Sequence, residues 1–270
     1  MKITAFLFMS TALTMAADKS AYHLFNPTPV EQMRGLSTDR PDQTESPYTV
    51  DAGHWQFEVD LLNWTHDDED GVRTDSLAVL PINVKLGLTN STDIEFVFES
   101  WSQEKVRGTE RLTRDGFGDL TVRLKQNLWG NDGGTTAFAL LPYVTLPLDA
   151  SDLGREDTEA GLILPFGINL PHDLYLGLMT RWDWINDDAG GHRNAWVNSV
   201  SLAYPISEQV GGYLEFASTV YDDDAPWEGT VDAGFTWGMT DNLQFDIGCN
   251  VGVTKSAPDV QPFLGVSYRY

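Results

Sequence analysis

The chain has 270 residues, with 17 Lys and Arg against 40 Asp and Glu, a formal net charge of −23 and a pI of about 4.3. So acidic a chain is not expected to bind nucleic acid, because phosphate contacts require clustered Lys and Arg. Aromatic residues make up 11% of the chain, too many for a disordered acidic protein. No apolar run approaches the roughly 20 residues of a transmembrane helix, but membrane β-strands give a much weaker signal.

Residues 1–17 are expected to form a secretory signal peptide. Lys2 supplies a positive charge, Ile3 to Met15 form a short apolar core, and Ala16 and Ala17 are small residues suited to cleavage. A buried N-terminal strand or helix is the alternative. Cys249 is the sole cysteine, so an internal disulfide is impossible and an exported chain needs another source of stability. Full closure of a β-sheet is one such source.

Residues 18–52 lack strong periodicity. Their prolines, charged residues and hydroxyl residues favour an extended polar segment over a helix. The segment is expected either to be a solvated periplasmic leader or to enter a polar cavity as a plug. In the second case Arg40 would pair with a wall carboxylate, and the residues that narrow the passage would be Asp39, Arg40, Asp42 and Glu45.

The stretch from Leu243 to Val253 alternates strictly, with apolar residues at odd positions and polar residues or Gly at even ones. Side chains on a strand alternate between its two faces, so one face is apolar and the other carries Asp246. Eleven residues match the roughly 9–11 of a membrane-spanning strand better than the roughly 5–6 of an ordinary one. Ile247 and Cys249 are therefore expected to face lipid, and Asp246 the lumen.

The same alternation recurs over residues 53–270 and predicts twelve strands. The least regular is 136–147, where both faces carry apolar residues and Pro142 interrupts the pattern. The expected strands are 54–64, 77–88, 94–99, 120–128, 136–147, 159–169, 174–184, 193–204, 210–216, 230–237, 243–253 and 260–270.

The connections between these strands alternate between tight turns and longer, mostly acidic loops, among them 65–75, 102–117 and 149–157. Short periplasmic turns and longer outer loops are typical of bacterial outer-membrane barrels. Trp residues gather near strand ends, at the expected headgroup levels. The sequence therefore predicts an all-β, closed antiparallel transmembrane β-barrel of about 12 strands in the outer membrane of a Gram-negative bacterium.

Four parts of the chain carry a family resemblance: Thr38–Pro47 followed by Gly53–Glu58, Gly116–Leu120, Gly238–Asp246 and Pro262–Tyr270. They resemble an outer-membrane "transporter" family named after the meta-pathway of phenol degradation. The resemblance implies a barrel for uptake of small, often aromatic compounds, and it brings no catalytic or binding residues with it. Many outer-membrane β-barrel chains end in Phe or Trp. This one ends in Tyr270, whose aromatic-terminated strand is still expected to engage the barrel assembly machinery.

The polar strand faces are expected to line the lumen. Twelve strands enclose more space than the eight that side chains just fill, but much less than a general porin. Acidic and basic side chains can therefore pair across a narrow or occluded passage. The expected lumen-facing residues are Glu58, Asp60, Lys85, Glu95, Glu99, Arg123, Lys125, Arg181, Asp183, Glu215, Asp232, Asp246 and Arg269.

The expected function is passage of small solutes, with small aromatic or hydrophobic compounds among the candidates, by a barrel surrounded by outer-membrane lipid and lipopolysaccharide. A structural or adhesive barrel without transport is the alternative. No enzyme, cofactor or metal site is expected, because the motifs of metalloproteases, serine hydrolases and phosphate-binding loops are missing. An outer-membrane lipase would need adjacent Ser and His, and His66 with Ser76 is the nearest pair.

Overall fold

The computed structural model describes residues 18–148, 153, 155, 157–187 and 190–270. The expected signal peptide, residues 1–17, and the acidic residues Asp149, Asp152 and Asp188 lie outside them. Two short 3-10 turns, η1 (Val30–Gln32) and η2 (Pro171–Asp173), accompany the strands. Among the described residues, no helix is long and apolar enough to cross a membrane. The strands are β1 (Trp55–Glu69), β2 (Val72–Val79), β3 (Ile82–Thr89), β4 (Thr92–Phe98), β5 (Trp101–Arg107), β6 (Arg111–Phe117), β7 (Leu120–Trp129), β8 (Thr136–Leu146), β9 (Glu159–Asn169), β10 (Tyr175–Asn186), β11 (His192–Pro205), β12 (Val210–Tyr221), β13 (Glu228–Thr240), β14 (Leu243–Gly252) and β15 (Val260–Arg269).

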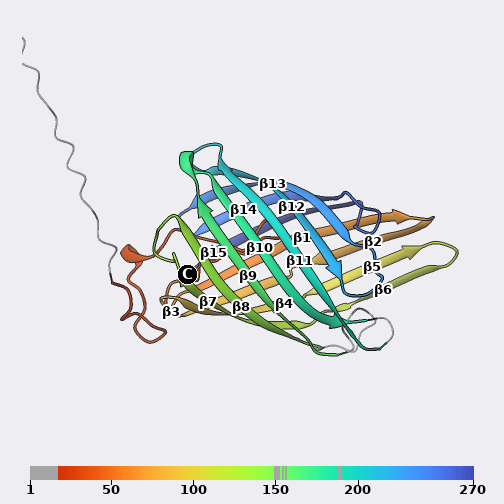
Figure 1. The fold of residues 1–270 in the computed structure, drawn as a ribbon, viewed down its shortest axis with the longest axis horizontal. Coiled ribbons are helices and arrows are strands. Elements are labelled where there is room, and N and C mark those ends of the chain that lie inside the picture. Colours follow the sequence, from red (N-terminus) through yellow and green to blue (C-terminus); the bar gives the residue numbers. More distant parts are fainter. Residues whose placement is uncertain (1–17, 149–152, 154, 156, 188–189) are drawn as a thin grey trace, which may run out of the picture.

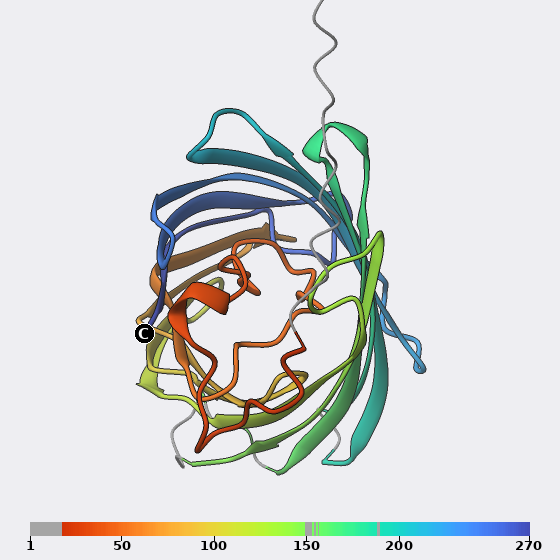
Figure 2. The same cartoon turned by 90° about the vertical axis from the view of Figure 1, so that its left-hand side faces the viewer.

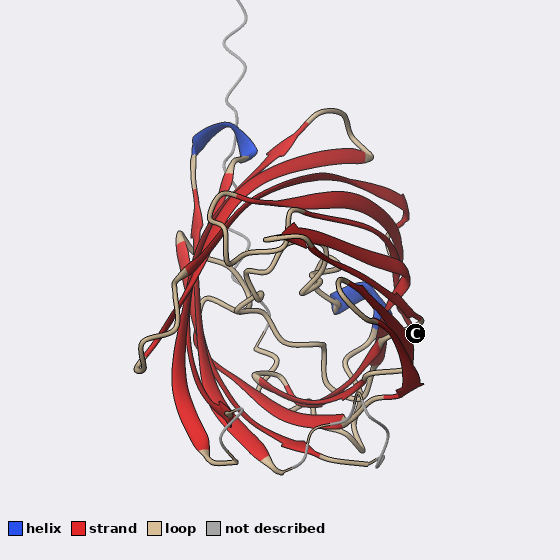
Figure 3. Ribbon diagram, turned by 90° about the vertical axis from the view of Figure 1, so that its right-hand side faces the viewer, coloured by secondary structure: helices blue, strands red, loops and turns tan. Residues whose placement is uncertain are grey.

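All these strands form one antiparallel sheet that closes on itself, because β15 pairs with β1 as well as with β14. Gln56 lies opposite Arg269 and Asn63 opposite Phe263 across this seam. The closed ring is visible from both ends of the molecule (Figures 2 and 3). The pairs β2 and β3, β4 and β5, and β6 and β7 each make one pass, so the fifteen strands cross the barrel twelve times. The predicted twelve-stranded closed antiparallel barrel is confirmed.

The connections divide between the two ends of the barrel as predicted. Short turns join β3 to β4, β7 to β8, β9 to β10, β11 to β12 and β13 to β14. The strand termini Trp55 and Tyr270 lie at this same end, where their backbones exchange two hydrogen bonds of 3.2 and 2.8 Å. The other end carries the long connection from β8 to β9, those from β12 to β13 and from β14 to β15, and the projecting hairpins β1–β2 and β5–β6 (Figure 1). The short-turn end is therefore periplasmic and the other end is the outer one.

Two of the predicted outer loops are wrong. Residues 65–75 and 102–117 are not loops but extensions of the sheet, because β1 continues to Glu69 and pairs with β2, and β5 pairs with β6. The prediction failed because these residues are polar or charged on both strand faces, as expected beyond the hydrocarbon layer. They project from the outer end of the barrel (Figure 1).

The predicted strand 77–88 is also interrupted. Leu80 has a left-handed φ of 58° and Pro81 offers no amide hydrogen, so the ladder breaks between β2 and β3. The break shifts the alternation by one residue. An uninterrupted strand would place Ala78 on the same face as Ile82, but Ala78 lies opposite Asn63 and Ser102, whose row faces inward.

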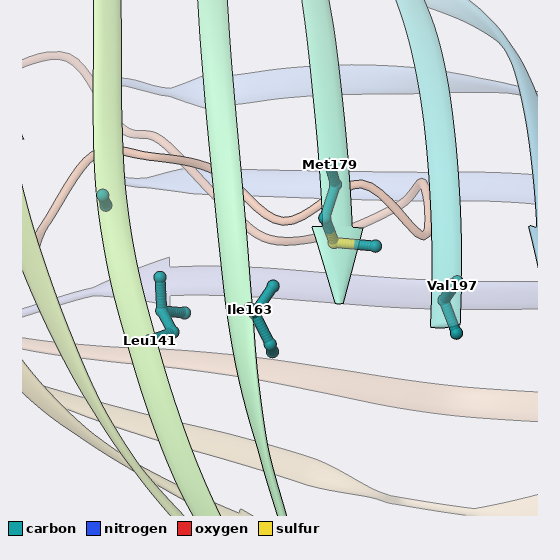
Figure 4. Close-up of a cluster of buried hydrophobic side chains, with 5 residues drawn as sticks. Leu141, Ile163, Met179 and Val197 are labelled. Atoms are coloured by element: carbon teal, nitrogen blue, oxygen red, sulfur yellow. The ribbon is translucent and has the colours of Figure 1, made fainter. Parts of the chain in front are cut away.

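The faces of the strands differ as a membrane barrel requires. On β14, the side chain of Ile247 is 55% exposed and that of Asp246 is 2% exposed. One part of the inner wall is apolar, where Ala139, Leu141, Ile163, Met179 and Val197 form a buried cluster. Figure 4 shows four of these side chains on neighbouring strands, β8 to β11. This inner apolar stripe explains why residues 136–147 carry apolar residues on both faces.

Candidate solute passage

The N-terminal segment, defined here as residues 18–54, starts at the short-turn end of the barrel (Figure 1), and its part from Asp39 onward runs inside the ring of strands (Figure 2). Its backbone is bonded to the barrel wall at several points. Leu24 N donates to Leu88 O at 2.8 Å, and Val50 N donates to the Asp93 carboxylate at 2.8 Å. At the periplasmic turn between β7 and β8, Thr49 N donates to the Asn131 side chain at 3.1 Å. A segment without periodicity of its own thus satisfies its buried amides with wall side chains.

Glycines on the inner wall make room for this segment. A Cβ at Gly87 would lie 2.1 Å from the Asp51 carbonyl oxygen, and one at Gly265 would lie 2.2 Å from the Arg40 guanidinium. At Gly177 the nearest atom would be Thr44 Cγ2 at 3.0 Å. The backbone and side chains of the segment therefore occupy space that any larger wall residue would fill.

Gly87→Ala is expected to loosen the segment, because the added methyl group meets backbone atoms that cannot rotate away. Backbone hydrogen exchange of residues 49–53 should become faster, while the barrel strands keep their protection. Gly35→Ala is the matched control, since nothing lies within 4 Å of its Cβ position. Equal exchange in the two variants would contradict close packing of the segment against β3.

Arg40 binds two carboxylates that flank β15 on one side of the lumen. Its Nη2 donates to Asp246 Oδ1 at 2.7 Å and its Nη1 donates to Asp60 Oδ1 at 2.5 Å. Asp60 comes from β1 and Asp246 from β14, and the guanidinium also lies 5.7 Å from the ring centroid of Phe263. Arg suits this position because its planar fork can hold two acceptors at once. The clamp joins the segment to both sides of the barrel seam.

Asp39 is the centre of a second, fully buried cluster. Its carboxylate accepts hydrogen bonds from Lys125 Nζ at 2.8 and 2.9 Å and from Lys85 Nζ. Lys85 also pairs with Glu58 at 2.5 Å, and Lys125 with Glu95 at 3.0 Å. The Asp39 amide donates to Glu58 at 3.0 Å. The two lysines lower the pKa of Asp39 against the effect of burial, so its carboxyl is ionised. Buried charges of this kind persist only when they are paired.

The next residues of the segment bind β12 and β13, and Glu45 returns to β7. The amides of Gln43 and Thr44 donate to the Glu215 carboxylate at 2.7 and 2.9 Å. Gln43 Nε2 donates to Asp232 at 2.6 Å, and Arg123 Nη1 donates to Glu45 Oε1 at 2.6 Å. Residues 39–45 therefore bridge strands on all sides of the lumen.

The carboxyl of Glu45 is only half satisfied, because its Oε2 is buried without a hydrogen-bond partner. Burial, helped by the negative charge of Asp39, raises the pKa of Glu45 to about 7, although Arg123 opposes the shift. Burial also raises the pKa of Asp42 to about 6. Both carboxyls have a higher pKa when the segment is bound in the lumen than when it is released. Between the two pKa values, each carboxyl is therefore more protonated in the bound state. Binding of the segment is therefore strengthened as pH falls from about 7 towards 4.5.

Acidification from pH 7.5 to 5 is accordingly expected to slow backbone hydrogen exchange in residues 39–46, after correction for the intrinsic rate. Glu45→Gln should flatten this dependence, because its side chain stays neutral at both pH values. Faster exchange at pH 5 in the unaltered protein would show that loss of the Glu45 to Arg123 ion pair outweighs relief of the buried charge.

The segment separates cavities at the two ends of the lumen. The outer one, about 420 Å³, is lined by charged, tyrosine and apolar side chains, among them Arg123, Tyr143, Ile163, Arg181 and Asp183. On the periplasmic side lie cavities of about 680 Å³ and about 390 Å³, and Arg40 and Asp42 line the smaller of these.

The expected lumen residues fall into separate groups. Glu58, Lys85, Glu95, Arg123 and Lys125 gather around Asp39 and Glu45. The pair Asp60 and Asp246 holds Arg40, and Glu215 and Asp232 hold Gln43. Arg181 and Asp183 pair with each other beside Tyr143, in the outer cavity.

Two expected lumen residues lie at the ends of the passage. Glu99 pairs with Arg155 at 2.9 Å in the break between β4 and β5. Arg269 bonds to Asn242 at the periplasmic end. The sequence analysis missed Asp93 and Asn131, which bind the segment's backbone, although Asp93 lies on the same strand face as Glu95.

The suggested lipase pair is wrong. His66 Nδ1 lies 2.8 Å from the Asp75 carboxylate, whereas Ser76 lies opposite Thr65 in the next row of the sheet, on the other face. Among the described residues, no group of three or more His, Cys, Asp or Glu side chains is arranged to hold a metal ion.

Outer-membrane proteins are among the solved structures that resemble this chain. The outer membrane channel COG4313 from Pseudomonas putida F1 is 13% identical, with a TM-score of 0.61 over 87% of this chain and 100% of that one. The NanC porin is 14% identical, with a TM-score of 0.52 over 78% of this chain and 98% of that one. The translocator domain of the autotransporter NalP from Neisseria meningitidis is 11% identical, with a TM-score of 0.50 over 80% and 87%. At these identities the likeness concerns the fold.

A search of curated protein sequences found no match. The family model described as "Putative MetA-pathway of phenol degradation" matches residues 38–270, from Thr38 in the N-terminal segment to the last residue. The match includes residues 39–45 of the N-terminal segment and every strand of the barrel. The chain is an outer-membrane β-barrel and belongs to this phenol-degradation family.

Proposed function

We propose that the barrel passes small solutes across the outer membrane, through a lumen that residues 38–50 occlude and that opens when they move aside. The observation that carries the proposal is the ion-paired course of residues 39–45 between the outer and periplasmic cavities. The charged side chains there are held by hydrogen bonds and ion pairs to polar atoms, which water or a polar solute can replace. A segment with a purely structural role could be held by apolar packing instead.

The outer cavity suggests which solutes enter first. Tyr143, Ile163 and Val197 supply apolar and aromatic surface, and Arg181 supplies guanidinium nitrogens beyond the one that binds Asp183. Such a lining suits a compound with one small ring and one or two polar groups. The family's description, which refers to phenol degradation, agrees with that class.

Deletion of residues 38–47 is expected to increase the rate at which phenol-sized solutes enter proteoliposomes at least severalfold. The reason is that the deletion removes Arg40, Asp39 and Glu45, the three charges that tie the segment to the wall. Folding is checked by the heat-modifiable mobility typical of membrane barrels. If the deletion variant folds but solute entry stays at the unaltered rate, the segment does not occlude the passage. A structural or adhesive barrel would admit solute in neither form.

A further inference from the structure

A four-stranded extension rises from the outer rim of the barrel, made of the outer half of β1 with β2, β5 and β6 (Figure 1). Its register aligns side chains in rows across neighbouring strands. The row farthest from the barrel is Asp68, Arg73, Arg107 and Arg111. Two residues closer to the barrel comes the row His66, Asp75, Lys105 and Thr113.

These two rows face away from the lumen. The next row on the barrel side, offset by one residue, contains Thr65, Ser76 and Glu104, which line a cavity of about 490 Å³ on the inner side together with Gln261 of β15. Successive side chains on a strand point to opposite faces, so Lys105 and Arg107 point outward. Closer to the membrane, the same outward face carries Trp64, Trp101 and Phe117.

The basic rows are unusual for this chain. Arg73, Arg107 and Arg111 lie directly opposite one another on three adjacent strands, an arrangement of like charges that destabilises a sheet. Arg73 pairs with Asp68 at 3.0 Å and Arg107 with Asp75 at 3.3 Å. In the part of the chain that the structure describes, Lys105 and Arg111 form no ion pair. The patch therefore has unused positive charge in a protein of net charge −23.

The height of the patch indicates its ligand. A strand rises about 3.3–3.4 Å per residue, so Lys105 lies about 13 Å along β5 from Trp101. With a strand tilt of about 35–45°, that places it about 10 Å beyond the aromatic residues, which sit where the acyl chains meet the headgroups. Phosphate groups of the outer leaflet lie in this zone, and guanidinium groups bind phosphate in a bidentate manner.

We propose that Lys105, Arg107 and Arg111, together with Arg73, form a binding site for the phosphorylated headgroup of lipid A in the outer leaflet. The phosphates neutralise the aligned guanidinium groups, and the acyl chains lie against Trp101 and Phe117, whose side chain is 63% exposed. Free phosphate satisfies only the first of these two contacts. The site is independent of the solute passage, because the inner face of the extension lies between them.

The test measures binding of bisphosphorylated lipid A to the purified, detergent-folded full chain by native mass spectrometry. Arg111→Gln is expected to weaken binding about tenfold, which corresponds to roughly 1.4 kcal/mol. The variant carrying Lys105→Gln, Arg107→Gln and Arg111→Gln should lose binding further. Arg114→Gln is the matched control: it removes the same charge from the same strand, but from the other face, where Arg114 pairs with Glu104 at 2.6 Å. It should bind within about twofold of the unaltered protein.

Two further arms identify the ligand. Dephosphorylated lipid A should bind the unaltered protein as weakly as bisphosphorylated lipid A binds the triple variant. Inorganic phosphate at millimolar concentration should compete poorly. The proposal is overturned if Arg111→Gln and Arg114→Gln bind equally, if dephosphorylated lipid A binds as tightly as the phosphorylated form, or if inorganic phosphate displaces the lipid. Because Arg111 is exposed, the single substitution remains a test even if the triple variant fails to fold.

Discussion

Ile247→Arg is expected to prevent most of the protein from reaching the folded, membrane-inserted state. Ile247 lies in the middle of β14 on the outward face, with 55% of its side chain exposed. An Arg or Lys facing lipid near the bilayer midplane costs about 2–4 kcal/mol. The measurement is the folded fraction after refolding into lipid vesicles, read from heat-modifiable mobility.

Asp246→Asn is the control from the neighbouring position on the opposite face. The substitution keeps the size of the side chain and an acceptor for Arg40, so the barrel should fold. It removes one of the two charges that hold Arg40, so solute entry should rise. If Asp246→Asn abolished folding while Ile247→Arg had no effect, the two faces of β14 would be reversed and the membrane barrel would be contradicted.

Asp39→Asn is expected to release the N-terminal segment from the lumen. The change leaves Lys85 and Lys125 buried without the carboxylate that they share, and removing one partner of a buried ion pair costs about 3–5 kcal/mol. Hydrogen exchange in residues 38–47 should become much faster, and single-channel conductance should rise.

Asp42→Asn is the matched control for Asp39→Asn. It also removes one carboxylate charge from the segment, but from a residue that is not paired with lysines. In the described part of the chain Asp42 forms no ion pair, and the charges of Asp39 and Asp232 add to the effect of burial in raising its pKa. Neutralising it should leave the segment bound or bind it more tightly. Equal loosening by both substitutions would mean that charge pairing at Asp39 does not hold the segment.

Most of the fold could be predicted because a bilayer imposes a strict period of two on each strand. In the stretch from Leu243 to Val253 every outward position is apolar, so both its length and its direction were readable. Residues 102–117 gave no such signal, because Lys105 and Arg107 on one face and Glu104 and Arg114 on the other are all charged. Outside the hydrocarbon layer neither face needs to be apolar, so strands and loops look alike.

The lumen could be predicted only in part, for a related reason. Alternation assigns Asp60 and Asp246 to the polar face of their strands but does not show that they meet one arginine, because 186 residues separate them. That meeting depends on closure between β1 and β15 and on the path of a segment without periodicity. Inward-facing glycines such as Gly87 and Gly177 were the available signal, because only a close backbone or side-chain approach requires them.

The most direct test of the central claim is to lock the segment to the wall. A Cβ at Gly177 would lie 3.8 Å from Thr44 Cβ, a separation that suits a disulfide. The variant Thr44→Cys, Gly177→Cys and Cys249→Ser leaves only the two introduced thiols. Single-channel conductance in planar bilayers should be low while the disulfide is intact and rise reversibly on addition of a reductant. Equal conductance in the oxidised and reduced states, with the disulfide verified by mass spectrometry, would contradict a passage that opens by movement of the N-terminal segment.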